Sequence, residues 1–381
     1  MKILQTITDL NLSSGGAASA TLNLFDELQR QKVDTTLLTL LPHHPNDLFM
    51  GSDRKGIVAF EYDGKTKFVY SRNLKKYLSE NRGFDLYHAN GIWTYPTHIT
   101  ARTALKLKKP YIITVHGMLN ENALKYTPMG KRAFLYLFQK EELSKAACIH
   151  ATSKYEAECI RKAGISTPVA IIPNGIKKSE IWNCKKHEES FCRFAYIGRI
   201  DPVKNIETLL EAWYKSGFVK NDRELLIIGG CSDASYLKKL HTFTNRYRLE
   251  NVHFTGQISH KETERIFATI KYLILPSKSE CFGMVVPEAL AKGIPVIATE
   301  GTPWSELNDY RCGWWIKNDT SSLCDALVTA YSTSEKDYNE MSENGIKVVT
   351  GKYTIEECAK KMKLLYEYIL GINNNKPDFI I

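Results

Sequence analysis

The chain has 381 residues, of which 43% are hydrophobic and 24% charged, and its formal net charge at pH 7 is +9. This composition excludes a disordered or fibrous chain, and the length predicts two domains. No apolar stretch approaches the roughly 20 residues of a membrane-spanning helix, and polar residues follow residues 1–7 too soon for a signal peptide, so we expect a cytoplasmic protein.

Metal-binding residue types do not occur in their usual spacings. The nine cysteines form no Cys-x-x-Cys pair, the ten histidines form no His-Glu-x-x-His pattern, and the sequence contains no Asp-x-Asp. We therefore expect reduced thiols and no metal cofactor. Most of the net positive charge lies in the first half of the chain. Such a surface could bind nucleic acid, an anionic membrane or a phosphorylated substrate, and the charge alone does not distinguish these partners.

Short β-rich runs alternate with helical patterns along the first half of the chain. The helix expected over residues 17–31 places Leu22, Phe25 and Leu28 on one face, which predicts that this face packs on a sheet. The alternation predicts a parallel sheet with crossover helices. Its strands are expected at residues 2–7, 35–41, 85–89, 111–115, 148–151 and 169–172.

The second half repeats this pattern after a polar linker over residues 173–189. Ser259 and Glu262 have the spacing of a capping box, which predicts a helix start. A final helix is predicted over residues 354–369, and the tail 373–377 is expected to be disordered. The strands of this half are expected at residues 194–197, 224–228, 252–254, 272–275 and 295–298.

Gly15 and Gly16 lie between the first strand and the first helix, where backbone N–H groups can approach an anion. The alternative is a turn that needs only a positive φ angle. Neither Gly-x-Gly nor Gly-x-x-x-x-Gly-Lys occurs anywhere in the sequence, which disfavours a dehydrogenase and a P-loop nucleotidase.

Residues 276–290 connect a strand to a helix. Pro287 is tolerated only in a first helical turn, which predicts a helix start near Gly283 and places Glu280 in the loop and Glu288 on the helix. Each carboxylate alone is more simply a solvated or helix-stabilising charge. Together they flank an exposed helix start, where carboxylates can accept hydrogen bonds from sugar hydroxyls.

A second segment, residues 198–205, also follows a strand and carries Arg199 and Lys204. Two cations at this place can stabilise a diphosphate leaving group as it gains charge. The simpler interpretation is that Arg199 pairs with Asp201 and that Lys204 begins a solvated helix face.

Together these segments resemble the family 4 glycosyltransferases of the GT-B architecture, over nearly the whole chain. The resemblance rests on Gly-Arg-x-Asp-x-x-Lys at 198–204 and on Glu-x-Phe-Gly at 280–283 with Glu288 after it. It implies an α/β fold of two Rossmann-like domains, 1–174 and 175–353, with an inter-domain cleft. The first is the acceptor side and the second binds the donor. The final helix, 354–371, is implied to cross back to the first domain.

The resemblance also implies residue roles. Arg199 and Lys204 hold the diphosphate, Glu280 contacts the transferred sugar and Glu288 binds the ribose hydroxyls. His116 of Val115-His116-Gly117 is implied to face the sugar and acceptor, although a lone histidine is more often structural. The other implied donor contacts are Gly15 and Gly16 beside the phosphates, Gln257 and Ile258 beside the base, Phe282, and the backbone N–H groups of Gly283, Met284 and Val285.

The sequence departs from the family pattern at two places. Asn205 stands where a glycine often follows the lysine, and residues 301–306, Gly-Thr-Pro-Trp-Ser-Glu, replace a glycine-rich loop. The second variant and residues 117–119 are similar to enzymes of bacterial capsule, O-antigen or exopolysaccharide synthesis. The resemblance thus implies a retaining, metal-independent transfer of a sugar from a UDP or GDP sugar to a saccharide or lipid-linked saccharide.

Attachment to an anionic membrane surface, on the inner face of the plasma membrane, is a further hypothesis. It rests on basic residues interleaved with aromatic residues: Lys125, Lys131, Arg132 and Lys140 with Tyr126, Phe134, Tyr136 and Phe138. The alternative is that the aromatic residues belong to the core, since Phe134, Leu137 and Phe138 share one helical face. Two other functions remain as alternatives. One is another GT-B activity such as a nucleotide-sugar epimerase. The other is nucleic-acid binding by the basic half, which is disfavoured because no stacking or groove-reading module is found.

Overall fold

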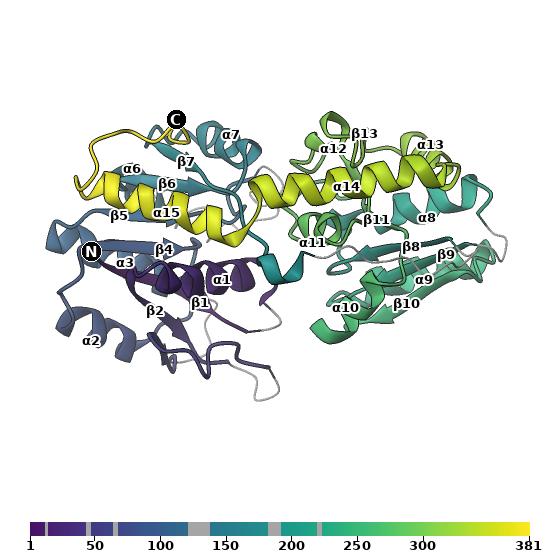
Figure 1. Cartoon of the computed structure of the whole chain (residues 1–381). Helices are drawn as coiled ribbons and strands as arrows, with labels where there is room; N and C mark the ends of the chain where they lie inside the picture. Colours follow the sequence, from purple (N-terminus) through teal and green to yellow (C-terminus); the bar gives the residue numbers. More distant parts are fainter. Residues whose placement is uncertain (12–13, 43–46, 64–67, 121–137, 182–191, 219–222) are drawn as a thin grey trace. The chain divides into compact units, whose positions relative to one another are not determined.

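The computed structural model describes residues 1–11, 14–42, 47–63, 68–120, 138–181, 192–218 and 223–381. Contacts divide the chain into two compact units (Figure 1). The first unit comprises Met1–Gly175 and Ile355–Ile381, and the second comprises Ile176–Thr354. Each unit is built on one parallel sheet.

The first unit contains a seven-stranded parallel sheet in the order β3-β2-β1-β4-β5-β6-β7. The order reverses direction between β1 and β4, as in doubly wound nucleotide-binding folds. The strands are β1 (Lys2–Asp9), β2 (Asp34–Leu40), β3 (Ile57–Phe60), β4 (Leu86–Asn90), β5 (Tyr111–Thr114), β6 (Cys148–Ala151) and β7 (Val169–Ile171).

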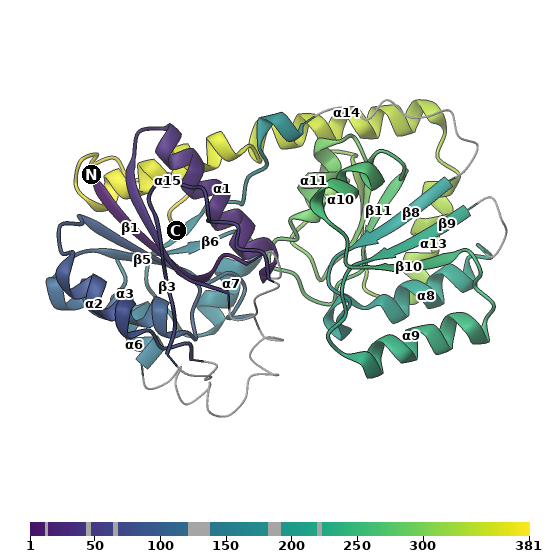
Figure 2. The ribbon, with the colours of Figure 1, turned by 90° about the horizontal axis from the view of Figure 1, so that it is seen from below.

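Helices cover both faces of this sheet because successive strand residues point to opposite sides. Leu4 and Ile113 face a core that includes Leu74 of α2, whereas Ile3 faces a core shared with Leu28 of α1. Figure 2 shows α1 and α15 on one side of the sheet and α2 and α3 on the other. The helices are α1 (Gly16–Arg30), α2 (Arg72–Glu80), α3 (Tyr95–Leu107), α6 (Lys140–Lys145), α7 (Lys154–Lys162) and α15 (Ile355–Ile369).

A buried chain of hydrogen bonds ties α15 to the sheet. Ile172 O can only accept, so His150 Nε2 donates to it at 2.7 Å, and Nδ1 of the same neutral ring accepts from the Thr114 hydroxyl at 2.8 Å. Thr114 Oγ1 in turn accepts from His88 Nε2 at 2.7 Å, and His88 Nδ1 accepts from the Tyr366 hydroxyl at 2.8 Å. Burial lowers the pKa of both histidines, that of His150 to about 4, which keeps both rings neutral.

The C-terminal segment corrects one expectation. Residues 373–377 have a defined path, because the residues after them pair with the exposed edge of β7. Ile381 N–H donates to Val169 O at 2.9 Å, Val169 N–H donates to Ile381 O at 3.0 Å, and Ile171 N–H donates to Phe379 O at 2.9 Å. The prediction of disorder was wrong because the polar composition of 373–377 does not reveal that the chain end completes a sheet edge.

The second unit contains a six-stranded parallel sheet in the order β10-β9-β8-β11-β12-β13. Its first strand, β8, is central, with β9 on one side and β11 on the other, so the order reverses between β8 and β11. The strands are β8 (Cys192–Ile197), β9 (Arg223–Ile228), β10 (Val252–Gly256), β11 (Tyr272–Leu275), β12 (Val296–Thr299) and β13 (Gly313–Ile316).

Helices also cover both faces of the second sheet. Helix α8 packs against α13, and α11 packs against α14. The capping box expected at α10 is present, since Ser259 Oγ accepts from Glu262 N–H and the Glu262 carboxylate accepts from Ser259 N–H. The α-helices are α8 (Ile206–Lys215), α9 (Ala234–Arg246), α10 (His260–Phe267), α11 (Val285–Ala291), α12 (Glu306–Asp309), α13 (Thr320–Tyr331) and α14 (Glu335–Lys352); the 3₁₀ helices are η3 (Lys178–Glu180) and η4 (Pro202–Lys204).

The predicted α/β fold of two Rossmann-like sheets is confirmed, and Leu22, Phe25 and Leu28 are buried as expected. Strands β3 and β13 were missed because both are short edge strands that lack a clear alternation. Of the proposed membrane-binding residues, those at 125–136 lie outside the described residues. Within the described part of the chain, no helix is long and apolar enough to cross a membrane.

Candidate active site

Two loops of the second unit meet at the point where its strand order reverses. The loop after β8 carries Arg199 and Lys204, and the loop after β11 carries Glu280 and Gly283. A main-chain hydrogen bond from Lys278 N–H to Val203 O, 2.8 Å long, joins the two loops directly. In open parallel sheets this crevice beyond the carboxyl ends of the strands is where ligands bind.

Lys204 and Glu280 form an ion pair between Nζ and Oε2, and Ser277 Oγ lies 3.4 Å from the same oxygen. Their side chains are only 14% and 18% exposed. Lys204 therefore does not begin a solvated helix face, and Glu280 is not a freely solvated carboxylate. The sequence predicted both residues as site residues, and the structure adds that they contact each other.

Arg199 is exposed, and its backbone is anchored from below, since the buried Tyr196 hydroxyl donates to Arg199 O at 2.6 Å. Asp201 does not pair with it in the described part of the chain. Instead Asp201 Oδ1 accepts from Val203 N–H at 2.9 Å and caps the short helix η4. The Arg199 guanidinium is thus a cation that faces solvent, in the same loop as Lys204.

Gly283 is required by its surroundings. Its φ is +76°, and a Cβ there would lie 2.9 Å from Leu275 Cδ2 and 3.1 Å from Glu280 Cγ. Helix α11 begins two residues later, at Val285 with Met284 as its N-cap, so the predicted start near Gly283 is close. The N–H groups of a first helical turn have no intrahelical acceptor, which leaves those of this loop available to an anion.

Phe282 anchors the loop rather than facing solvent. Phe282 is 6% exposed, and its ring lies 5.3 Å from the ring of Trp304 and 6.0 Å from that of Tyr353, centroid to centroid. The Trp304 indole N–H donates to Phe282 O. Residues 301–306, which depart from the family pattern, therefore support the Glu280 loop, and Glu280 N–H donates to Gly301 O at 2.7 Å.

Glu288 lies on the first turn of α11. Burial raises the pKa of its carboxyl to about 7, and Lys292, one helical turn later, opposes this shift. Lys292 is itself 2% exposed, and its Nζ lies 3.2 Å from Glu264 Oε1. A partly buried carboxyl whose pKa lies near 7 can accept hydrogen bonds from neighbouring hydroxyl groups.

The turn after β10 adds a third loop to this edge of the sheet. Gln257 is exposed and Ile258 is half-buried against the core. Gly229 and Gly230, which follow β9 and join the loops together, were not predicted as site residues. Gly229 N–H donates to Gly256 O at 2.9 Å, and Ile200 N–H donates to Gly230 O at 2.8 Å. A glycine pair directly after a strand was the signal that could have identified them.

Asn205 has φ +60° and is 3% exposed. Asparagine tolerates the left-handed conformation better than most residues, which explains why it can replace a glycine here. Its amide also donates to Asn318 Oδ1 at 2.8 Å, and its Oδ1 accepts from Thr208 Oγ1 at 2.8 Å. This departure from the family pattern therefore preserves the turn after Lys204.

In the first unit, His116 and the Gly15–Gly16 pair follow β5 and β1, at the carboxyl edge of that sheet. Gly15 is the N-cap of α1, and Gly16 is its first residue; both are exposed. His116 Nε2 is buried and has no hydrogen-bond partner among the described residues. Burial and the neighbouring His150 lower the pKa of His116 to about 3, so the ring is neutral.

Comparisons with known proteins agree with this geometry. Residues 14–180 match the family described as Glycosyltransferase Family 4, and residues 180–348 match Glycosyl transferases group 1. The chain is 26% identical over 314 residues to an uncharacterized glycosyltransferase of Methanocaldococcus jannaschii, covering 81% of this chain and 82% of that protein. The chain belongs to the family 4 glycosyltransferases.

Two further similarities extend this result. The glycosyltransferase is 29% identical over 174 residues to an uncharacterized 41.2 kDa protein in a cps region of Klebsiella pneumoniae, covering 43% of this chain and 46% of that protein. Its fold superposes on Anabaena HepE, solved with UDP and glucose, with a TM-score of 0.75 at 16% identity, covering 96% of this chain and 99% of that chain. The glycosyltransferase thus has the GT-B fold.

The described residues of the glycosyltransferase contain no group of three or more histidine, cysteine, aspartate or glutamate side chains that could hold a metal ion. Arg199 and Lys204 are among the cationic side chains at the strand reversal of the second unit, together with Lys278. A positive charge near a diphosphate can therefore come from these side chains.

Proposed function

We propose that this enzyme transfers a sugar, with retention of anomeric configuration, from a nucleoside diphosphate sugar to a saccharide or lipid-linked saccharide. The observation that carries the proposal is the convergence of Lys204, Glu280 and Gly283 at the strand reversal of the second sheet. There a cation, a carboxylate and a glycine-lined loop occupy one edge. The chemistry of this set matches the three parts of such a donor: diphosphate, sugar hydroxyls and a closely approaching backbone.

In the proposed reaction, Arg199 and Lys204 stabilise the diphosphate as the glycosidic bond breaks and negative charge develops on it. Lys204 can exchange its contact with the Glu280 carboxylate for the phosphate, which frees Glu280 to accept from a sugar hydroxyl. The leaving phosphate takes the proton of the attacking acceptor hydroxyl on the same face. No protein nucleophile is needed. Glu288 is assigned to the ribose, Gln257 and Ile258 to the base.

Assembly of a bacterial surface polysaccharide is the proposed setting. The relative in a cps region and the Gly-Thr-Pro-Trp-Ser-Glu segment at 301–306 support it. The proposed attachment of the first unit to an anionic membrane is tested by co-sedimentation with phosphatidylglycerol and phosphatidylcholine vesicles at low salt. Binding that is equal for both lipids, or absent from both, contradicts it.

The donor is tested by thermal unfolding with UDP, ADP and GDP side by side. A nucleotide that binds the native state at a concentration of 100 times its Kd stabilises it by about 2.7 kcal/mol, so only the cognate nucleotide should raise Tm appreciably. UDP is the expected one, since HepE was solved with UDP. Failure of all three nucleotides to raise Tm contradicts the proposed function. NMR of the transferred linkage then establishes whether the anomeric configuration is retained.

A further inference from the structure

Glu156 is a buried carboxylate beneath the turn that carries His116. It lies on the first turn of α7 and is 1% exposed. One oxygen, Oε1, accepts from Gly117 N–H. The other, Oε2, accepts from Thr152 N–H at 2.6 Å and from the Thr152 hydroxyl at 2.7 Å. Three donors from two separate loops therefore converge on one carboxylate.

The turn that Glu156 contacts is conformationally costly. His116 has φ +45° and Gly117 has φ +77°, so two successive residues are left-handed. For a residue other than glycine this conformation costs on the order of 1–3 kcal/mol and persists only where the surroundings hold it. Within the turn, Met118 N–H donates to Val115 O at 3.0 Å. The Gly117 N–H, which also belongs to this turn, donates to the Glu156 carboxylate.

Simple helix capping does not account for this arrangement. Ser153 is the N-cap of α7, and its hydroxyl accepts from Glu156 N–H at 3.1 Å, which is the usual half of a capping box. In the other half, a glutamate at this position bonds the backbone of the N-cap residue. Here the carboxylate instead bonds Thr152 and, 39 residues earlier in the sequence, Gly117. Its contacts reach from α7 to the loop after β5.

We propose that Glu156 is a positioning residue that holds the His116–Gly117 turn, and thereby the imidazole, in the orientation in which His116 contacts the transferred sugar. This inference rests on the proposed function. Gln at position 156 has nearly the same shape, but one of its terminal atoms is a donor. That amide N–H₂ must face either Gly117 N–H or the Thr152 donors, so one loop loses its acceptor.

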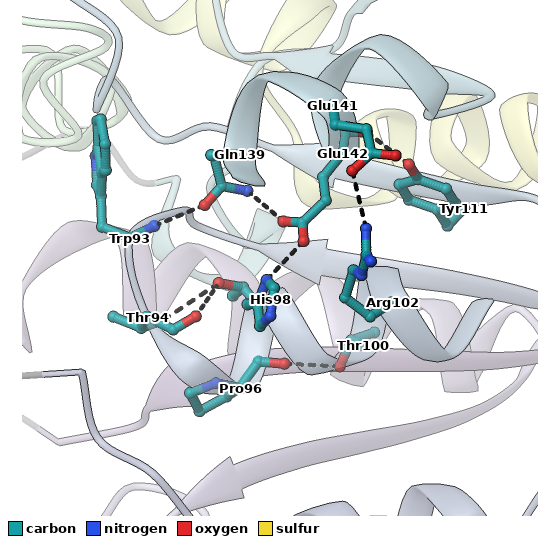
Figure 3. Close-up of polar contacts among 11 residues, drawn as sticks. Trp93, Thr94, Pro96, His98, Thr100, Arg102, Tyr111, Gln139, Glu141 and Glu142 are labelled. Carbon is teal, nitrogen blue, oxygen red and sulfur yellow. Dashed lines mark hydrogen bonds and ion pairs between the residues drawn. The ribbon is translucent and has the colours of Figure 1, made fainter. Parts of the chain in front are cut away.

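Glu142 provides a matched control in the same unit. It is also a buried glutamate, with Gln139 Nε2 2.9 Å from Oε2 and His98 Nδ1 2.6 Å from Oε1 (Figure 3). Burial raises the pKa of both carboxyls. Figure 3 shows Glu142 of α6 between these two partners, and neither of them belongs to the turn at residues 115–118. Both Gln variants should therefore lower stability, whereas only one should alter the turn.

The experiment measures nucleotide release from UDP-glucose, ADP-glucose and GDP-mannose by the full-length wild-type enzyme, and then uses the donor with the highest rate. Glu156→Gln should lower kcat on the order of a hundredfold, the usual cost of a displacement of about 1 Å. It should leave the nucleotide Kd unchanged, because none of the residues assigned to the nucleotide lies in the His116–Gly117 turn or on α7. Glu142→Gln should keep kcat within about twofold. Folding is checked by circular dichroism and Tm.

A double-mutant cycle separates positioning from a purely structural role. If Glu156 acts through His116, then Glu156→Gln should have little further effect on kcat in a His116→Ala background. Wild-type kcat in folded Glu156→Gln, or losses that multiply in the double variant, would overturn the inference. Should Glu156→Gln not fold, Glu156→Asp, which keeps the charge on a shorter side chain, takes its place with the same expected results. A wild-type enzyme inactive on all three donors would instead refute the proposed function, and the role of Glu156 with it.

Discussion

Lys204→Ala is the most direct test of the donor site. The variant removes the ammonium that contacts Glu280 in the free enzyme and that we assign to the diphosphate. Because the diphosphate gains negative charge as the glycosidic bond breaks, a cation beside it binds the transition state more tightly than the ground state. We therefore expect kcat to fall, and not merely the donor KM to rise.

The size of the effect follows from the burial of the pair. Lys204 and Glu280 are 14% and 18% exposed, which places them near the surface but largely out of water. Two unit charges about 4 Å apart at an effective dielectric constant of about 20 interact by about 4 kcal/mol. Removing one preorganised charge-stabilising donor from an enzyme costs about 2.7–4 kcal/mol, a factor of about 10² to 10³ in kcat. The two energies agree, so we expect kcat of Lys204→Ala to fall by about 10² to 10³.

The assay is initial-rate kinetics at saturating donor, with Lys215→Ala as the control. Lys215 also pairs with a glutamate, Glu211, at 2.6 Å, but its side chain is 54% exposed on α8 and lies outside the candidate site. Exposed pairs contribute about 0–1 kcal/mol, so this variant should keep normal kcat and nearly normal stability. Near-normal turnover of Lys204→Ala at saturating donor would refute the phosphate assignment and the site built around this loop.

Three further predictions test other parts of the molecule. Glu288→Gln should mainly raise the donor KM, because ribose hydroxyls do not change charge during the reaction; a large loss of kcat at unchanged KM contradicts this. Activity should persist in excess EDTA, since Arg199 and Lys204 supply the positive charge; complete loss that added Mg²⁺ or Mn²⁺ restores would show otherwise. Acid should destabilise the first unit through His150, whose pKa is lowered from 6.5 to about 4. The unfolded chain binds the proton first, so this stability is present above pH 6.5 and is lost as the pH falls towards 4. The loss at pH 5 is about 2 kcal/mol, measured by urea unfolding at pH 7.5 and 5. In His150→Gln the pH dependence should shrink by that amount, and an unchanged dependence would disprove it.

Several predicted strands match the observed ones closely. Residues 148–151 and 272–275 are strands with the predicted bounds, and each lies inside its sheet. A strand buried on both faces is a continuous apolar run, which is visible locally. The edge strands β3 and β13 escaped prediction because both are short and lack a clear alternation, whereas the edge strands β7 and β10 were predicted. The pairing of the chain end with β7 joins residues that are far apart in the sequence, so no local pattern predicts it.

For the candidate site, the residue types and the loops that carry them could be predicted from the sequence. Arg199, Lys204, Glu280 and Glu288 follow strands in motifs whose spacing can be read along the chain. The contact between Lys204 and Glu280 could not be predicted, because the two lie 76 residues apart and meet only where the strand order reverses. The position of Glu156 under the His116 turn also became visible only in the folded protein. Covalent spacing governs local conformation, whereas contacts between distant residues depend on how the strands are ordered, and that order becomes fixed only when the sheets assemble.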